Sequence, residues 1–206
     1  MEPKNRTMML WTIAAFAGLA LIAIVSKSPA QAPDEGESEI QRGFAINPVP
    51  LNLDGKSRGL VGLGSYIVNA QQGCYACHSC PSYVGLAADN PYASGGTLDE
   101  VNTPGPVNKA NYLAGGVVFG PFVSRNLTPN PAEGNLPAGL TFDQFANVIR
   151  TGHDPDNPGQ ILQVMPWPVL RHMSEHDLRA VYEYLSAIPH AEPGNCVEPD
   201  EFIPIK

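Results

Sequence analysis

The stretch Cys74-Tyr75-Ala76-Cys77-His78 decides the fold that this sequence is expected to adopt. Apolar side chains recur at helical spacing just before it, at Leu60, Leu63, Ile67 and Ala70. After it, from Pro81 to Pro131, frequent Gly, Pro and Asn are typical of a long loop, in which Gly116–Val123 is a candidate strand. With 20 Gly and 21 Pro among 206 residues, the chain favours a few short helices joined by long loops. Such a chain buries little apolar side-chain surface, so a large bound cofactor would supply core that it lacks.

Two thiols separated by two residues and followed at once by a histidine form the attachment signature of a c-type haem. The sulfurs of Cys74 and Cys77 reach the two vinyl groups of one porphyrin and form thioethers, and His78 then meets the iron from the same side. Other proteins use a Cys-x-x-Cys pair as a redox dithiol or as half of a zinc site. The βαβ context of the dithiol is missing here, and so is a second ligand pair for zinc. We therefore expect one covalently bound haem c.

The opposite face of the iron has a second ligand or an open position, and Met165 is the residue that we expect there. It lies in Val164–Pro168, whose prolines keep the chain extended and remove N–H donors, so that the thioether is free to face the iron. A neutral sulfur ligand favours ferrous iron and raises the reduction potential. Met173, at the edge of the last helix, is a poorer choice. Bis-histidine ligation is a further alternative, from four histidines: His153, His172, His176 and His190.

Two more helices are expected after the long loop. The first begins at Thr141, where Gln144 completes a capping box, and it ends at Gly152. The last begins at Ser174, and Pro189 ends it. These helices are too few and too short to form a dry core alone. Wrapped around a flat porphyrin, they could form one together with it.

The N-terminal residues 1–32 are expected to lie outside the globular fold as a membrane segment. Basic residues precede an apolar run of 18 residues, 8–25, and an acidic stretch follows, which indicates that the N-terminus stays inside and the remainder is exported. The run is near the ~20 residues that span a bilayer, so we expect a retained anchor. The alternative is a cleaved signal peptide, because Ala30–Ala32 is similar to a cleavage site, although Pro33 follows it directly.

The rest of the chain is divided by its composition and charge. Residues 33–58 show no clear periodicity and are interpreted as a tether, 59–190 as the globular domain and 191–206 as a tail.

Beyond residue 32 the chain has 9 Lys and Arg against 19 Asp and Glu, a net charge of −10. Nucleic acid requires a basic face, so we expect no such partner. A redox partner with a basic patch fits this charge, and so does the simpler interpretation that acidity keeps an exported protein soluble.

Two cysteines, Cys80 and Cys196, remain outside the motif. In an oxidising compartment a leftover pair usually bonds, so we expect an internal disulfide that ties the tail to the loop after the motif. A free thiol and a bond to another chain are the alternatives.

On these residues the sequence resembles the class I c-type cytochromes, and more narrowly the bacterial membrane-associated monohaem cytochromes and the cytochrome subunits of periplasmic alcohol and sugar dehydrogenases. The resemblance covers about residues 59–190 and rests on Cys74–His78, Gly116–Pro129, Arg150–Gly152, Met165–Pro168 and Met173–Leu185. It implies an all-α cytochrome c fold with His78 and Met165 as axial ligands. It also implies that three residues lie near the haem: Arg125, Asn126 and Trp167. Those dehydrogenase subunits usually carry several haem domains, whereas this chain has one motif, which favours a single-haem carrier or a small subunit.

These expectations describe an electron-transfer protein, not an enzyme. It would pass single electrons between periplasmic or membrane redox partners, such as a dehydrogenase, an oxidase or another cytochrome. The alternative is a haem-bearing subunit of a periplasmic dehydrogenase or respiratory complex. A haem enzyme or gas sensor with an open iron site is less favoured, because its substrate would have to displace the methionine sulfur. The expected location is the periplasmic side of the bacterial inner membrane, with an N-terminal membrane helix, or the periplasm if the segment is cleaved.

Overall fold

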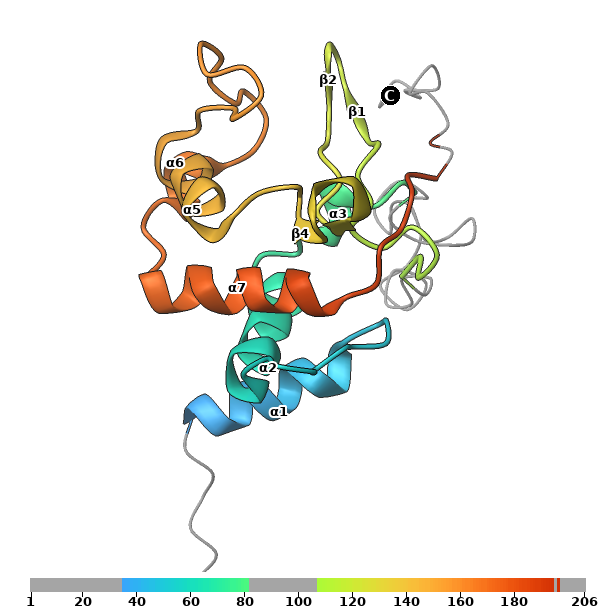
Figure 1. Ribbon diagram of the computed structural model, residues 1–206, viewed down its shortest axis with the longest axis vertical. Coiled ribbons are helices and arrows are strands. Elements are labelled where there is room, and N and C mark those ends of the chain that lie inside the picture. Colours follow the sequence, from blue (N-terminus) through green and yellow to red (C-terminus); the bar gives the residue numbers. More distant parts are fainter. Residues whose placement is uncertain (1–34, 82–106, 195, 197–206) are drawn as a thin grey trace, which may run out of the picture. The chain divides into compact units, whose positions relative to one another are not determined.

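The computed structural model of the protein describes residues 35–81, 107–194 and 196, and this part is helical with two small antiparallel sheets (Figure 1). The helices are α1 (Glu35–Ile46), α2 (Arg58–Tyr66), α3 (Tyr75–His78), α5 (Phe142–Thr151), α6 (Trp167–Leu170) and α7 (Glu175–Ala187), with a π-helix η1 (Ile67–Gln71) and a 3-10 helix η2 (Pro131–Glu133). The sheets pair β1 (Val118–Phe119) with β2 (Phe122–Val123), and β3 (Pro129–Asn130) with β4 (Leu136–Pro137).

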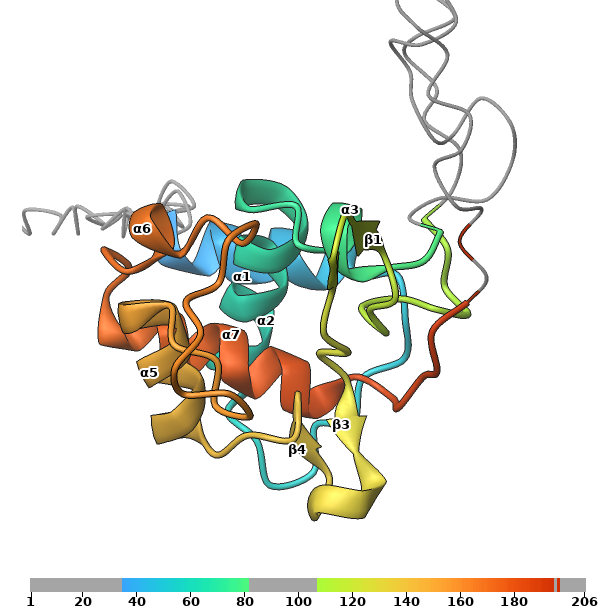
Figure 2. The ribbon, with the colours of Figure 1, turned by 90° about the horizontal axis from the view of Figure 1, so that it is seen from above.

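The core forms where α7 crosses α2 (Figures 1 and 2). α2 begins after Ser57, whose hydroxyl accepts a hydrogen bond from the Leu60 N–H and so satisfies a free helix-end donor. At the crossing, a Cβ on Gly64 would lie 1.9 Å from the Ala180 carbonyl oxygen of α7. The two helices therefore touch backbone to backbone. Fully buried side chains surround this contact: Val61, Val68, Leu178, Tyr184 and Leu185.

α1 packs against α2 just as closely. A Cβ on Gly43 would lie 1.9 Å from the Gly62 carbonyl oxygen, and the buried Ser65 hydroxyl donates a 2.7 Å hydrogen bond to the Gly43 carbonyl. The prediction that residues 33–58 form an irregular tether is therefore wrong for residues 35–46. The apolar stripe of α1 is short, and the residue that makes its closest contact is a glycine, so hydrophobic periodicity did not reveal this helix.

A buried polar cluster joins the end of α1, the π-helix, α7 and the loop at Tyr112. The Tyr112 and Tyr184 hydroxyls lie 2.9 Å apart. The Asn69 amide donates to the Tyr184 hydroxyl at 3.2 Å, and the Tyr184 hydroxyl donates to Asn47 Oδ1 at 2.8 Å. Burial raises the pKa of both tyrosines, so their hydroxyls stay neutral and available for hydrogen bonding.

The helix starts predicted from capping residues are confirmed. The Thr141 hydroxyl accepts from the Gln144 N–H, and the Gln144 side chain accepts from the Thr141 N–H, which completes the capping box. The Ser174 hydroxyl accepts from the Asp177 N–H at 3.0 Å. Gly152 ends α5 in the left-handed conformation, with φ at 72°.

The candidate strand over Gly116–Val123 is a two-stranded hairpin. β1 and β2 pair in antiparallel register, and Gly120 and Pro121 form the turn between them (Figure 1). Gly120 adopts a φ of 61°, a conformation that suits glycine in a tight turn.

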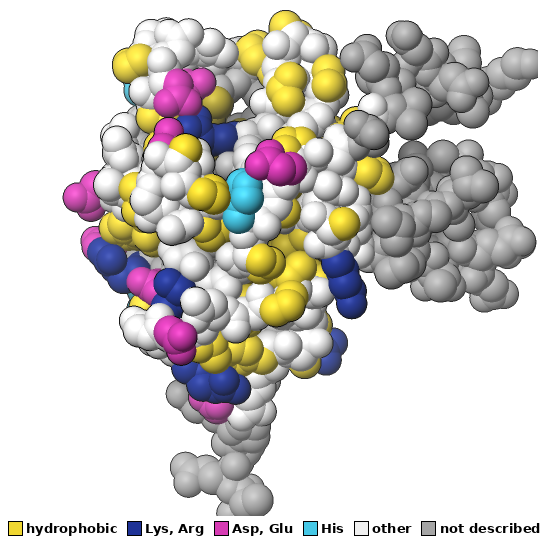
Figure 3. Space-filling model, turned by 45° about the vertical axis from the view of Figure 1, so that its right-hand side comes forward, with side chains coloured by type: hydrophobic (Ala, Val, Ile, Leu, Met, Phe, Trp, Pro, Cys, Tyr) yellow, Lys and Arg dark blue, Asp and Glu magenta, His cyan; other side chains and the backbone are white. Residues whose placement is uncertain are grey.

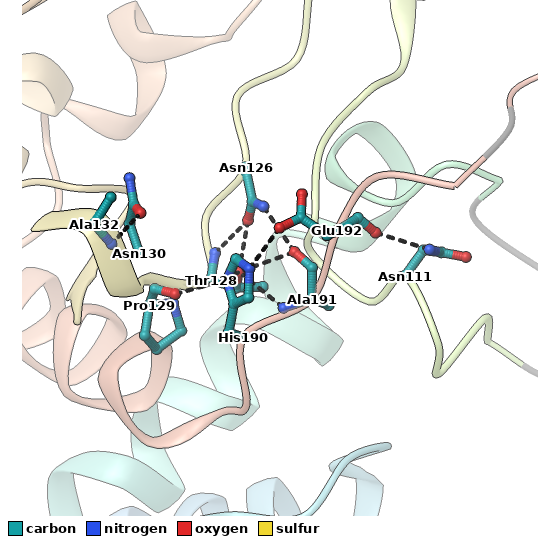
Figure 4. A network of polar contacts seen from close by, with 9 residues as sticks. All are labelled: Asn111, Asn126, Thr128, Pro129, Asn130, Ala132, His190, Ala191 and Glu192. Atoms are coloured by element: carbon teal, nitrogen blue, oxygen red, sulfur yellow. Dashed lines mark hydrogen bonds and ion pairs between the residues drawn. The ribbon is translucent and has the colours of Figure 1, made fainter.

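Residues 190–194, here called the C-terminal strap, run from beyond α7 toward the residues that follow α3 (Figures 1 and 2). The side-chain amides of Asn111 and Asn126 each donate a 2.8 Å hydrogen bond to a carbonyl of the strap (Figure 4). Beyond the strap, Cys196 forms a disulfide with Cys80, 116 positions away in sequence, with Cα atoms 5.2 Å apart. The predicted disulfide is confirmed.

The N-terminal residues 1–32, where a membrane segment is predicted, lie outside the described residues, as do tail residues 197–206. Of the helices that the structure describes, none combines the length and the apolar character needed to cross a bilayer.

Replacing Gly64 by alanine is expected to weaken the crossing of α2 and α7. The added methyl group meets the Ala180 carbonyl oxygen, which is backbone and cannot rotate away, so we expect a loss of about 1–3 kcal/mol in unfolding free energy. Gly59→Ala is the matched control in the same helix, because a Cβ on Gly59 would have no neighbour closer than 3.8 Å. Alanine has a higher helix propensity than glycine, so this control should raise the unfolding free energy by up to ~1 kcal/mol. Denaturant unfolding followed by circular dichroism measures both, and equal stabilities would contradict the prediction.

Candidate functional site

The Cys-x-x-Cys-His motif forms α3, a single helical turn that follows the π-helix. Gly73, with φ at 59°, turns the chain between the two. The Cys74 N–H donates to the Val68 carbonyl at 3.1 Å, and the His78 N–H closes the turn by donating to the Cys74 carbonyl at 3.0 Å. Residues three and four apart are neighbours on a helix surface, so the spacing puts the side chain of Cys74 next to those of Cys77 and His78 within one helical turn.

The His78 side chain is held by a backbone carbonyl. Its Nδ1 lies 2.8 Å from the carbonyl oxygen of Arg125, and because a carbonyl only accepts, Nδ1 carries the proton and Nε2 the lone pair. Burial lowers the pKa of His78, with the carbonyl hydrogen bond acting in the opposite direction. A neutral imidazole with a fixed tautomer and a free Nε2 is the form in which histidine binds metal ions.

Two tightly packed stretches, 113–116 and 124–127, position the Arg125 carbonyl. The Gly115 N–H donates to the His78 carbonyl at 2.6 Å, and backbone hydrogen bonds of 2.8 and 3.0 Å join the stretches. A Cβ on Gly115 would lie 2.6 Å from the carbonyl carbon of Arg125. The backbones therefore approach too closely for any side chain at this position, and the acceptor for His78 is fixed by packing.

The two motif cysteines differ in exposure. Cys74 is half-buried against the core, whereas Cys77 is exposed, and neither takes part in a disulfide. Burial raises the pKa of the Cys74 thiol to about 11; a backbone hydrogen bond lowers it, and the nearby Cys77 adds to the rise. Cys74 is therefore a neutral thiol at neutral pH.

Met165 lies in the loop between α5 and α6. Its side chain is half-buried against the same core cluster to which Cys74 and Tyr75 pack. The Trp167 N–H donates to the Met165 carbonyl at 2.8 Å, where the chain turns into α6. The structure thus brings Met165 and the motif to one core, and the role of Met165 as an iron ligand stays a prediction.

Trp167 fixes the Met165 loop, residues 153–165, against the end of α5. Its indole N–H donates to the Leu162 carbonyl at 3.1 Å, and the Leu162 N–H donates to the Gly152 carbonyl at 2.8 Å. A Cβ on Gly152 would lie 2.3 Å from the Trp167 ring. The ring therefore rests on Gly152 and closes the base of the loop.

The residues considered as alternative iron ligands are placed differently. The four histidines outside the motif are all exposed: His153, His172, His176 and His190. Met173 packs against the core near the start of α7. Over the ranges that the structure describes, no group of three or more His, Cys, Asp or Glu side chains is arranged to hold a metal ion.

Two parts of this site carried no signal in the sequence. The Arg125 carbonyl is a backbone group that every residue has, so its role depends on packing alone; the resemblance implied only that Arg125 lies near the haem. The polar cluster around Tyr112 and Tyr184 joins residues 72 positions apart. Such a contact requires the tertiary fold.

Comparison with known proteins gives a distant similarity. No family model matches the chain, and no solved structure matches it. It is 26% identical over 174 residues to a protein of Gluconobacter oxydans (strain 621H), the cytochrome c subunit of an alcohol dehydrogenase (quinone). The match covers 84% of this chain and 26% of the relative, so the chain spans about a quarter of the relative's length. The chain is thus distantly similar to a cytochrome c subunit.

Gly152→Ala is expected to loosen the Met165 loop. The substitution forces a φ of 72° on a residue with a side chain and drives its methyl group into the Trp167 ring, for a combined loss of about 2–4 kcal/mol in unfolding free energy. Gly159→Ala is the control in the same loop, because its Cβ would meet nothing within 4 Å. Thermal unfolding reports stability, and near-ultraviolet circular dichroism reports the packing of Trp167. A Gly152 variant that matches the control in both would refute the expectation.

Proposed function

We propose that this protein is a c-type cytochrome that transfers single electrons between redox partners in the periplasm or at the membrane. One haem c would be bound through Cys74 and Cys77, with His78 and Met165 as axial ligands. The observation that carries the proposal is the geometry at α3: two cysteines within one helical turn of a histidine whose Nδ1 donates to a carbonyl 2.8 Å away. The distant similarity to a cytochrome c subunit supports it.

The residues present fit a haem group. Bound haem supplies an iron that alternates between the ferrous and ferric states. Cys74 and Cys77 would hold the porphyrin through thioethers, and the Arg125 carbonyl holds the proton of His78 on Nδ1, so that the lone pair on Nε2 would bind the iron. The half-buried thioether of Met165 is a neutral donor that favours the ferrous state and raises the reduction potential.

The wider setting belongs to the same proposal. A cytochrome c fold is supported by the helix that leads into the motif, the crossing of α2 with α7 and the long loops between them. Export and membrane attachment are supported by the apolar run over residues 8–25 and by a disulfide, which forms in oxidising compartments. The described residues on the face in Figure 3 carry acidic and basic side chains interspersed along one side. The net charge of −10 beyond residue 32 favours a redox partner with a basic patch.

A second candidate is the haem-bearing subunit of a dehydrogenase complex. The similarity to the cytochrome c subunit of an alcohol dehydrogenase favours it. The two candidates differ in what stays bound, so mild solubilisation and size-exclusion chromatography distinguish them. A subunit elutes with a dehydrogenase at fixed stoichiometry. A carrier elutes alone, because it binds the partner that reduces it only transiently.

The haem proposal is tested by pigment that stays with the chain. When the protein is exported by a host that attaches c-type haem, we expect one haem per chain in a pyridine haemochrome assay, retained after acid–acetone extraction. Cys77→Ala removes one thioether and should sharply lower the haem content. The matched control is Cys196→Ser, which removes a cysteine outside α3 and should keep the haem. Wild-type protein exported without attached haem would contradict the proposal.

The second ligand is tested separately by Met165→Ala. Loss of the sulfur should lower the reduction potential and remove the ferric sulfur–iron charge-transfer band, because a weaker donor or water replaces the thioether. Met173→Ala is the control, since it removes a methionine that packs on the same core. If Met165→Ala keeps the band and Met173→Ala loses it, Met173 is the ligand.

A further inference from the structure

Arg125 contacts both halves of the candidate site through different atoms. Its backbone carbonyl accepts the His78 hydrogen bond at 2.8 Å. Its guanidinium Nη1 lies 2.7 Å from an Asp156 carboxylate oxygen and 3.9 Å from one of Asp154. Both acids belong to the Met165 loop. One residue therefore joins the histidine side of the site to the methionine side.

The Arg125 side chain is fixed in this position by a third contact. Its Nε donates to the Ala138 carbonyl at 3.0 Å, while the guanidinium reaches the loop. The Arg125 side chain is 35% exposed, that of Asp154 25% and that of Asp156 71%, so solvent and salt screen the pair with Asp156 more than the pair with Asp154. The planar guanidinium donates along fixed directions, which a lysine ammonium does not reproduce.

Backbone hydrogen bonds join the two sides of the Met165 loop, so a contact at Asp156 also restrains the later part of the loop. The Asp154 N–H donates to the Gln160 carbonyl at 3.1 Å, and His153 pairs with Ile161 in an antiparallel bridge. The base of the loop is closed by Leu162 and the Trp167 indole, as described above. Met165 lies three residues after Leu162 in the same loop, so we expect movement of the loop relative to Arg125 to move Met165 as well.

We propose that Arg125 is a positioning residue that holds the Met165 loop in place relative to His78, through its ion pair with Asp156. This inference rests on the proposed function, because it concerns the two expected iron ligands. Arg125 acts through the loop and needs no contact with the iron. A solvated surface ion pair, by contrast, would leave the behaviour of Met165 unchanged.

Imidazole competition on the ferric holoprotein tests this inference. With Met165 as the second ligand, imidazole would displace its sulfur: one iron–sulfur bond would break, one iron–nitrogen bond would form, and the oxidation state of the iron would not change. A loosened loop holds the sulfur less well, so Arg125→Gln and Asp156→Asn should each bind imidazole roughly two- to fivefold more tightly than wild type. Arg125→Lys should fall between, because it keeps the charge and loses the fixed donor geometry.

The matched control is Glu175→Gln, which removes a carboxylate from the Glu175–Arg179 pair on α7; Glu175 is 77% exposed and Asp156 71%. It should leave the imidazole affinity at the wild-type value. The double variant Arg125→Gln/Asp156→Asn should be no more affected than Arg125→Gln alone, because Arg125→Gln already removes the ion pair with Asp156. Added salt should tighten imidazole binding in wild type and have little effect in Asp156→Asn.

The outcomes separate the two claims. Imidazole affinities of Arg125→Gln and Asp156→Asn that match Glu175→Gln, or effects that add in the double variant, would overturn the role of Arg125 and leave the haem proposal intact. A wild-type protein without attached haem would overturn the proposed function and this inference with it. Haem contents measured before each titration show which of these has occurred.

Discussion

The close crossing of α2 and α7 is the contact on which the rest of the structure depends. At Gly64 the two backbones meet with no space for a side chain, and both halves of the candidate site extend from this point. α2 continues through the π-helix into α3, which carries the thiols and His78. α7 continues into the strap, which returns to the loops around His78. A shift at the crossing would therefore move the motif and the strap relative to each other.

The π-helix explains how the crossing is connected to the motif. A π-helix widens the turn by one residue and is frequent at functional sites. Here it carries Asn69, whose amide donates to the Tyr184 hydroxyl and to the Ser65 carbonyl. Each such hydrogen bond contributes about 1 kcal/mol, but losing one partner leaves the others buried and unsatisfied. Together, the hydrogen bonds of the cluster therefore restrain the π-helix, and with it α3, more than any single one of them would alone.

Local chemistry made part of this structure predictable from the sequence. Thr141 and Ser174 cap their helices with their own hydroxyls, Gly152 ends α5 through its own backbone conformation, and the motif spacing is local by definition. The disulfide was predictable from the count of cysteines and the expected compartment. What was missed depends on contacts between distant segments: α1 is helical because it packs on α2, and Arg125 matters through a carbonyl. The position of Met165 relative to His78 stays a prediction.

The disulfide has a consequence for how the chain matures. Cys74, Cys77 and Cys80 lie within seven residues, while Cys196 is supplied by the opposite end of the chain. Thioether formation consumes reduced thiols, whereas the Cys80–Cys196 bond requires oxidation, so a chain that carries a thioether-linked haem needs opposite redox treatment for two neighbouring cysteine pairs. A premature bond among the three clustered cysteines would consume a thiol that haem attachment needs. Once the chain has folded, the burial of Cys80 keeps it away from any thiol that is still free.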